Sequence, residues 1–430
     1  MKAPGFNAAY MAYGLLGLPL AMAALPVYVH IPAFYALHLE IGFAQLGWVL
    51  FAARLFDTIQ DPLLGLMIDR LGSRLNACLL AASAVFALAF AALWMPPSGG
   101  NIAVAWLGVS LVCVYSAHSF LSIAYFAWGA SLDGVSARAQ VLLGPAAWRE
   151  AAGLIGILLA SAIPAAVMSG DPELVSYRMA WYSTGFGMLL LIAMVVLLSA
   201  APAWARTARP ENQWVPALRS VFANRRLTQL LLPYLLNALS ISLPATLVLF
   251  FIRDQLQAPE LGAAFLIAYF AAAVTCLPLW VRLATRIGTN QAWRAGMALA
   301  VGAFAGTALL GPGDTLPYFA VCLAAGAALG ADLALPPVLF AQAIGDSPRK
   351  GIYYSFYTLL GKLALAMTGL SLPLLATLGY QPGGGSSALL AAMYAGLPCL
   401  LKVAALFSLR RIREDHNDLP CPVAGGMCRK

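Results

Sequence analysis

The chain has 430 residues, of which 62% are hydrophobic and only 10% are charged, and its formal net charge is +8. Soluble domains carry about a quarter charged residues, so this composition excludes an ordinary water-soluble fold and predicts an all-α membrane protein. The positive charge does not indicate nucleic-acid binding, because the basic residues gather in the connections on one side of the predicted helices.

Apolar runs of roughly 20 residues predict twelve transmembrane helices. In chain order we expect them at residues 8–37, 42–68, 76–96, 102–132, 147–169, 178–201, 226–252, 260–285, 292–311, 316–343, 351–379 and 386–410. The first run lacks a small-residue cleavage site after a short apolar core. We therefore expect it to remain as an uncleaved anchor.

The connections between these helices differ in charge. With the N-terminus inside, the outer connections hold little beyond Arg178 and Arg253. The inner connections and the tail hold Arg70, Arg74, Arg138, Arg206, Arg209, Arg219, Arg225, Arg226, Arg286, Arg349, Lys350, Arg410, Arg411 and Arg413. Cytoplasmic loops of membrane proteins are enriched in arginine and lysine. We expect both termini in the cytoplasm and the protein in a bacterial inner membrane.

The longest polar connection, residues 202–225, divides the helices six and six. The segment DPLLGLMIDRLGSR, which begins at Asp61, resembles LPLWVRLATRIGTN, which begins at Leu277, 216 positions later. This pattern predicts two six-helix pseudo-repeats and resembles the major facilitator design. We expect an N-terminal bundle at 1–201, a central loop at 202–225, a C-terminal bundle at 226–410 and a cytoplasmic tail at 411–430.

The first copy of this repeat resembles the superfamily's loop signature, G-x-x-x-D-R-x-G-x-R. Its glycines permit a tight turn, and its charged side chains can cap helix ends across the inner face. We interpret Asp69, Arg70 and Arg74 as conformational residues and not as substrate ligands.

Three charges interrupt the apolar sequence FAARLFDTIQDPLLG of the second predicted helix: Arg54, Asp57 and Asp61. The two acids lie one turn apart on one helix face. A charge at the bilayer centre costs roughly 2.5–3.5 kcal/mol on insertion scales, so a bound cation, a proton or a nearby base must neutralise the pair. An alternative is a structural Arg–Asp network that holds two helices together.

The eleventh and tenth predicted helices each carry one charge in their apolar sequence. Lys362 is expected to pair with an acid across a central cavity, and Thr358 lies one turn before it on the same face. Asp332 precedes two prolines that bend its helix. It is either a proton carrier or a packing anchor.

Helices four and five supply further polar and aromatic side chains. Arg149 and Glu150 are adjacent, so we expect them to point in different directions, each toward its own partner or toward interfacial water. His118 is interpreted as a packed polar residue. The remaining candidates are Ser119, Ser122, Tyr125, Phe126, Trp128 and Trp148.

These motifs resemble the glycoside–pentoside–hexuronide:cation symporters, the melibiose permease-like family of the major facilitator superfamily. ARLFDTIQDPLLG is similar to the helix-two signature and LLGKLALA to the helix-eleven segment. The resemblance implies a cation site at Asp57 and Asp61, with Arg54 and Lys362 as charge partners. It implies that Ser119 supplies a hydroxyl to the cation, and Gln60 stands where the family has an asparagine.

The sugar-binding positions depart from the family. The resemblance places Ser122 and Phe126 where the family has an aspartate and a tryptophan, and Pro19 near a missing helix-one aspartate. Arg149 matches a family arginine, and Tyr125 and Trp128 lie among these positions. We therefore expect a more apolar cavity and no useful affinity for melibiose-like sugars.

The resulting hypothesis is a cation-coupled symporter, not an enzyme, that moves a small solute by alternating access. A sugar or glycoside is the family default, and a lysophospholipid or other anionic amphiphile is the alternative; a membrane-embedded sensor or enzyme is a remote one. We expect Na⁺ or H⁺ as the coupling cation, with Li⁺ as a further candidate. We expect no other cofactor, a monomer in membrane lipid, and no metal site, since Cys421, Cys428 and His416 fit no strong ligand spacing.

Overall fold

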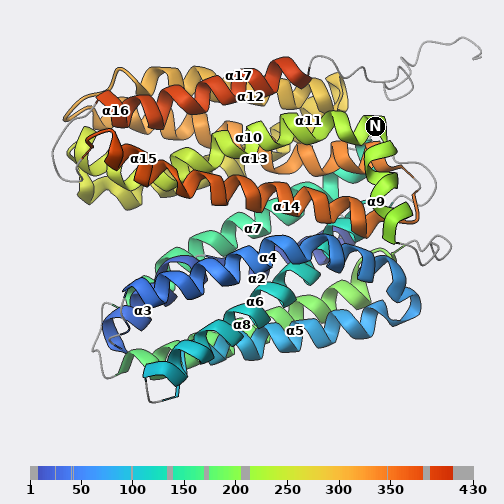
Figure 1. Ribbon diagram of the computed structural model, residues 1–430. Helices are drawn as coiled ribbons and strands as arrows, with labels where there is room; N and C mark the ends of the chain where they lie inside the picture. Colours follow the sequence, from blue (N-terminus) through green and yellow to red (C-terminus); the bar gives the residue numbers. More distant parts are fainter. Residues whose placement is uncertain are drawn as a thin grey trace, which may run out of the picture.

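The computed structural model describes residues 8–24, 26–39, 41, 43–97, 100–132, 139–168, 174–204, 214–345, 347–380 and 388–409. Within these ranges the regular structure is entirely helical, as expected. Figure 1 shows two helical bundles lying side by side, one from each half of the chain. The predicted tail at 411–430, Arg138, Arg206, Arg209 and Arg410 lie outside the described residues.

The first half begins with a broken span, not with the continuous helix expected at 8–37. It consists of α1 (Ala8–Gly14), α2 (Gly17–Met22), the π-helix η1 (Pro26–His30) and α3 (Ile31–His38). Proline lacks an N–H and clashes with the preceding turn, so Pro19, Pro26 and Pro32 explain much of this interruption. The rest of the half comprises α4 (Phe43–Leu71), the short η2 (Gly72–Arg74), α5 (Leu75–Ala92), α6 (Gly100–Gly129), α7 (Ala139–Met168) and α8 (Val175–Ala200).

Two glycines bring the broken span against α7. A Cβ atom on Gly14 would lie 2.7 Å from the backbone of Trp148, and one on Gly17 would lie 2.5 Å from the carbonyl oxygen of Arg149. Only glycine allows such close approach of two backbones. This contact fixes the position of Arg149 relative to the first span.

The second half contains a corresponding set of helices. They are α10 (Arg225–Phe250), η4 (Phe251–Gln255), η5 (Pro259–Leu261), α11 (Gly262–Ile287), α12 (Thr289–Thr307), α13 (Thr315–Ile344), α14 (Lys350–Gly369), α15 (Ser371–Thr377), α16 (Ala388–Ala391), η6 (Ala392–Gly396) and α17 (Leu397–Leu409). One further helix, α9 (Trp214–Ala223), lies in the central connection, where we expected a loop.

Eight continuous helical segments of the described chain are long and apolar enough to cross a membrane, and one of them, Gln45–Ala92, contains two predicted spans. The predicted spans outside this set are the broken first one, α12, and the pair α14 and α15. The twelve-helix arrangement is therefore compatible with the structure.

The two ends of the molecule are packed differently. We call the end with η2, α9 and the start of α14 the basic face, and the end with α3, α15 and α16 the opposite face (Figure 1). The largest hydrophobic core joins both halves and includes Leu66 and Leu75 of the first half with Tyr353 and Tyr354 of the second. A separate core near the opposite face contains residues of the second half only. A third, smaller core joins Leu154 of the first half to α11 and α13, so the halves share packing at the basic face and midway along the helices.

Candidate functional site

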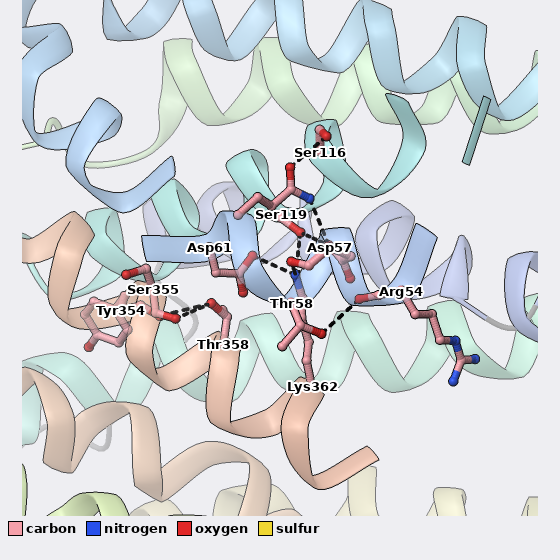
Figure 2. Close-up of polar contacts among 11 residues, drawn as sticks. Arg54, Asp57, Thr58, Asp61, Ser116, Ser119, Tyr354, Ser355, Thr358 and Lys362 are labelled. Atoms are coloured by element: carbon pink, nitrogen blue, oxygen red, sulfur yellow. Dashed lines mark hydrogen bonds and ion pairs between the residues drawn. The ribbon is translucent and has the colours of Figure 1, made fainter. Parts of the chain in front are cut away.

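The two helix-two acids and Lys362 meet between the halves of the molecule. Asp57 and Asp61 project from α4 and are 5% and 0% exposed, and Lys362 projects from α14. The Lys362 ammonium donates to three side-chain oxygens at 2.7 Å each: Asp57 Oδ1, Asp61 Oδ1 and Ser119 Oγ. It also lies 3.1 Å from the carbonyl oxygen of Asp57. Figure 2 shows these side chains converging on one point.

Polar side chains of α4 and α6 complete the surroundings of Asp57. Ser119 Oγ donates to Asp57 Oδ1 at 2.8 Å, and Gln60 Nε2 donates to the same oxygen at 3.1 Å. Ser116 Oγ in turn donates to Gln60 Oε1 at 2.8 Å. Ser116 was not among the expected site residues; its spacing of three from Ser119 on an apolar helix is a signal that could have identified it.

The charges of this cluster do not balance if both acids are ionised. Two carboxylates face one ammonium, and Asp61 Oδ2 is buried without a hydrogen-bond partner. A buried carboxylate oxygen without a partner is costly. The site can therefore accommodate a proton or a small cation, and oxygen ligands of this kind suit hard cations.

Two expected members of this group have other contacts. The Arg54 guanidinium points away from Asp57 (Figure 2) and lies within reach of the Tyr115 hydroxyl. The Thr358 hydroxyl donates to carbonyl oxygens of its own helix, Ser355 at 3.0 Å and Tyr354 at 3.3 Å, and also lies near the Asp61 carboxylate. The structure thus brings Lys362, and not Arg54, against the two acids.

Arg149 and Glu150 form a pair, so the expectation that each has its own partner was wrong. Arg149 Nε donates to Glu150 Oε1 at 2.8 Å, and Arg149 Nη2 lies 2.8 Å from the same oxygen. A long guanidinium side chain can bend back to its neighbour although the two Cβ atoms diverge on the helix. The Arg149 Cζ atom lies 4.3 Å from the centre of the Phe126 ring, a cation–π contact.

Aromatic rings link this pair to the second half. We call Phe126, Tyr354, Tyr357 and Tyr234 the aromatic seam. Phe126 stacks on Tyr354 with ring centres 5.7 Å apart and meets Tyr357 edge-on at 5.0 Å, while Tyr357 stacks on Tyr234 at 4.4 Å. Because these rings come from α6, α14 and α10, the seam closes the interface between the halves beside Arg149.

Of the other expected substrate residues, Tyr125 lies near this pair and Trp128 has separate contacts. Tyr125 packs on Tyr13, with ring centres 4.6 Å apart, and each donates its hydroxyl to the other's backbone carbonyl. Trp128 donates to the carbonyl oxygen of Pro202 and packs on Trp204, so its ring faces the central connection.

Ser122 and His118 complete the α6 candidates. Ser122 is half-buried on the same helix as Ser119 and Phe126. His118 Nε2 lies 3.2 Å from the carbonyl oxygen of Leu20, and its ring meets Phe86 at 5.6 Å. These contacts agree with the interpretation of His118 as a packed polar residue.

A second buried ion pair lies inside the C-terminal bundle. Lys402 on α17 donates to Asp332 Oδ2 at 2.5 Å, and Trp293 Nε1 on α12 donates to Asp332 Oδ1 at 3.0 Å. Asp332 and Lys402 are each 5% exposed. The arrangement joins three helices and supports the packing-anchor interpretation of Asp332. Sequence reasoning missed Lys402, although a single lysine in the apolar run LPCLLKVAAL is a clear signal.

The loop-signature acid contacts the other half at the basic face. Asp69 accepts hydrogen bonds from the backbone N–H groups of Gly351 at 2.6 Å and Ile352 at 3.0 Å, at the N-terminus of α14. Lys350 donates to the carbonyl oxygen of Ala130, just after the end of α6, at 2.8 Å. A carboxylate at a helix N-terminus and an ammonium near a helix C-terminus are both favourable. Arg70 is half-buried and Arg74 is exposed at the same turn.

The chain is similar to a known protein family and to several solved structures. A family described as MFS/sugar transport protein has a model that matches residues 10–415. No curated protein matches the sequence.

Several solved structures share the fold. The transporter FucP in its outward conformation has a TM-score of 0.70 at 12% identity, covering 96% of this chain and 100% of its own. A bacterial homologue of the iron transporter ferroportin has a TM-score of 0.68 at 13% identity, covering 94% and 98%. The human organic anion transporter MFSD10 has a TM-score of 0.61 at 18% identity, covering 93% and 98%. At such identities the likeness concerns the fold alone.

Proposed function

Because the chain belongs to the MFS/sugar transport protein family, whose members are integral membrane transporters and not enzymes, we propose that it is a cation-coupled symporter. The observation that carries this proposal is the position of the Lys362 ammonium, 2.7 Å from both carboxylates and from Ser119. Oxygen atoms that already surround one monovalent cationic group are suited to hold another.

In this proposal Lys362 occupies the cation's place when no cation is bound. A Na⁺ ion or a proton entering the site competes with the ammonium for Asp57 and Asp61. Because Lys362 belongs to the second half and the acids to the first, this exchange changes the attraction between the halves. The cation gradient is thereby coupled to the movement of one half against the other.

The contacts at the basic face supply the other part of the cycle. Asp69 and Lys350 hold α14 against the first half there, and α14 also carries Lys362 about three turns further on. A rigid helix thus connects the closed face to the cation site. If the basic face is cytoplasmic, as the charge asymmetry predicts, the structure represents an outward-facing state.

For the solute, we propose a sugar or glycoside held near Ser122, Phe126 and Arg149. The half-buried serine, the aromatic ring and the guanidinium offer hydrogen bonds and a stacking surface at the interface. The second candidate is an anionic amphiphile such as a lysophospholipid. Its support is the loss of acids from the site, where Ser122 stands in place of one family aspartate and Pro19 lies near the position of another.

Uptake into proteoliposomes tests this function. We expect methyl glucoside, offered as a radiolabelled probe, to accumulate above its external concentration under an inward Na⁺ or H⁺ gradient and to lose this accumulation in the Asp57→Asn variant. Lysophosphatidylglycerol serves as the probe for the second candidate. Glu260→Gln, at an exposed site near the opposite face, is the matched control. Equal uptake with and without either gradient would contradict coupling.

A further inference from the structure

The Arg149–Glu150 pair uses only part of its capacity for hydrogen bonds. Both guanidinium contacts end on a single carboxylate oxygen, Glu150 Oε1. Among the residues that the structure describes, Arg149 Nη2 is buried without a properly aligned hydrogen bond, although the Tyr13 hydroxyl lies near the guanidinium, and the hydrogen bond that Glu150 accepts goes to Oε1 and not to Oε2. The side chains are 7% and 17% exposed, so Glu150 is the more accessible of the two. The pair has no net charge but presents one unused acceptor beside one unused donor.

We propose that Glu150 sets the charge selectivity of the transporter, an inference that rests on the proposed function. An isolated guanidinium in this apolar surrounding would attract a carboxylate or phosphate, because arginine forms strong paired contacts with such groups. Glu150 already fills that role from within the chain. A substrate anion would have to displace it or lie next to a like charge. The site therefore favours uncharged, hydroxyl-bearing solutes over anions.

The chemistry of a hydroxyl group fits the unused atoms. A hydroxyl oxygen can accept from Arg149 Nη2 while its proton, or that of a neighbouring hydroxyl, is donated to Glu150 Oε2. Each hydroxyl that leaves water must find such partners, since unsatisfied polar groups are costly when buried. The Phe126 ring of the aromatic seam has its centre 4.3 Å from Arg149 Cζ and so packs against the guanidinium.

Removing the carboxylate charge alone should uncover an anion site. The experiment measures thermal unfolding of the purified protein with choline glucuronate against choline chloride at equal ionic strength, so that no coupling cation is added. We expect no difference between the two salts for the unmodified protein. Glu150→Gln should gain a saturable stabilisation by glucuronate, with an apparent affinity at least tenfold tighter than that of the unmodified protein. The double variant Arg149→Gln, Glu150→Gln should lose it.

Three further variants make the result decisive. Glu260→Gln removes an exposed glutamate charge and should behave like the unmodified protein. Glu150→Asp retains the charge and should bind glucuronate no better than the unmodified protein, whereas Glu150→Ala removes the charge and covers the case in which Glu150→Gln does not fold. Identical responses of the unmodified protein and of the uncharged Glu150 variants, whether both bind glucuronate or neither does, would overturn the proposal. Because no gradient is involved, this result is independent of whether transport is coupled.

Discussion

Lys362 is the residue on which the account of the cation site depends most. It contacts two acids from the other half of the molecule and is itself only about one-fifth exposed. Breaking a buried ion pair by removing one partner leaves an uncompensated charge. The consequences of replacing Lys362 therefore differ with and without a competing cation.

Lys362→Met should destabilise the protein in the absence of sodium by about 3–5 kcal/mol, the usual cost of leaving a buried charge unpaired. Added Na⁺ should recover more of this loss than it contributes to the unmodified protein, because the ion no longer competes with the ammonium. Thermal unfolding in choline and in sodium buffers measures both effects.

The control variant for Lys362→Met is Arg282→Met, which removes an exposed positive charge from α11. Its stability should change little in either buffer. A Lys362→Met protein as stable as the unmodified one in choline would show that the ammonium does not compensate the acids.

Local sequence reasoning predicted much of the candidate cation site. The i, i+4 spacing of Asp57 and Asp61 and the lone Lys362 in an apolar helix both agree with the contacts found. It predicted that Lys362 pairs with an acid across the interface; Arg54 satisfies the same charge argument, but its guanidinium points away from Asp57. It was wrong for Arg149 and Glu150, since the flexibility of a long side chain overrides the divergence of adjacent positions.

At the scale of helices, apolar length located the spans but not their interruptions. The predicted helices at 178–201 and 316–343 nearly coincide with α8 (Val175–Ala200) and α13 (Thr315–Ile344). The first span was expected to be continuous, because hydropathy does not register the cumulative effect of its prolines. Helix α9 was missed because its polar flanks resemble a loop.

The three-helix contact of Asp332, Lys402 and Trp293 should act as a structural anchor. Asp332→Asn should lower stability by about 3–5 kcal/mol, because it leaves the Lys402 ammonium buried without its counter-charge. The double variant Asp332→Leu, Lys402→Met removes both charges and should recover most of this loss. Denaturant or thermal unfolding of the three proteins provides the measurement.

Transport assays distinguish the anchor from a proton carrier. The Asp332→Leu, Lys402→Met protein should retain its dependence on the cation gradient. Loss of coupling with retained stability would instead assign Asp332 a role in proton transfer.

At the scale of the whole molecule, the basic face is closed. The hydrophobic core that joins both halves and the hydrogen bonds of Asp69 to α14 both indicate this closure. Ser355 illustrates this closure, because it is fully buried and a Cβ atom on Gly65 would lie 2.7 Å from its own Cβ. Opening of this face must separate α4 from α14 at these residues.

Asp69→Ala should shift the population toward a state open at the basic face. Loss of its two charge-assisted bonds, worth about 1–2 kcal/mol, changes the ratio of the two states roughly 5–30-fold. In a background without the native cysteines, labelling of Ser355→Cys by a membrane-impermeant maleimide should accelerate accordingly when Asp69→Ala is added.

The control for the labelling rate of Ser355→Cys is a second variant at the same face. Arg74→Ala changes an exposed member of the loop signature and should leave the rate for Ser355→Cys nearly unchanged. Equal rates with and without Asp69→Ala would mean that this carboxylate does not hold the face closed.

The central claim is that Asp57 and Asp61 bind the coupling cation, and cation-dependent stability tests it without knowledge of the substrate. The melting temperature of the purified protein is followed at constant ionic strength as Na⁺ or Li⁺ replaces choline, and separately as the pH is lowered. A ligand at one hundred times its Kd stabilises by about 2.7 kcal/mol. We predict a saturable rise with at least one of these cations for the unmodified protein, and none for Asp57→Asn, Asp61→Asn. The same rise in both proteins, or no rise in either, would contradict the account.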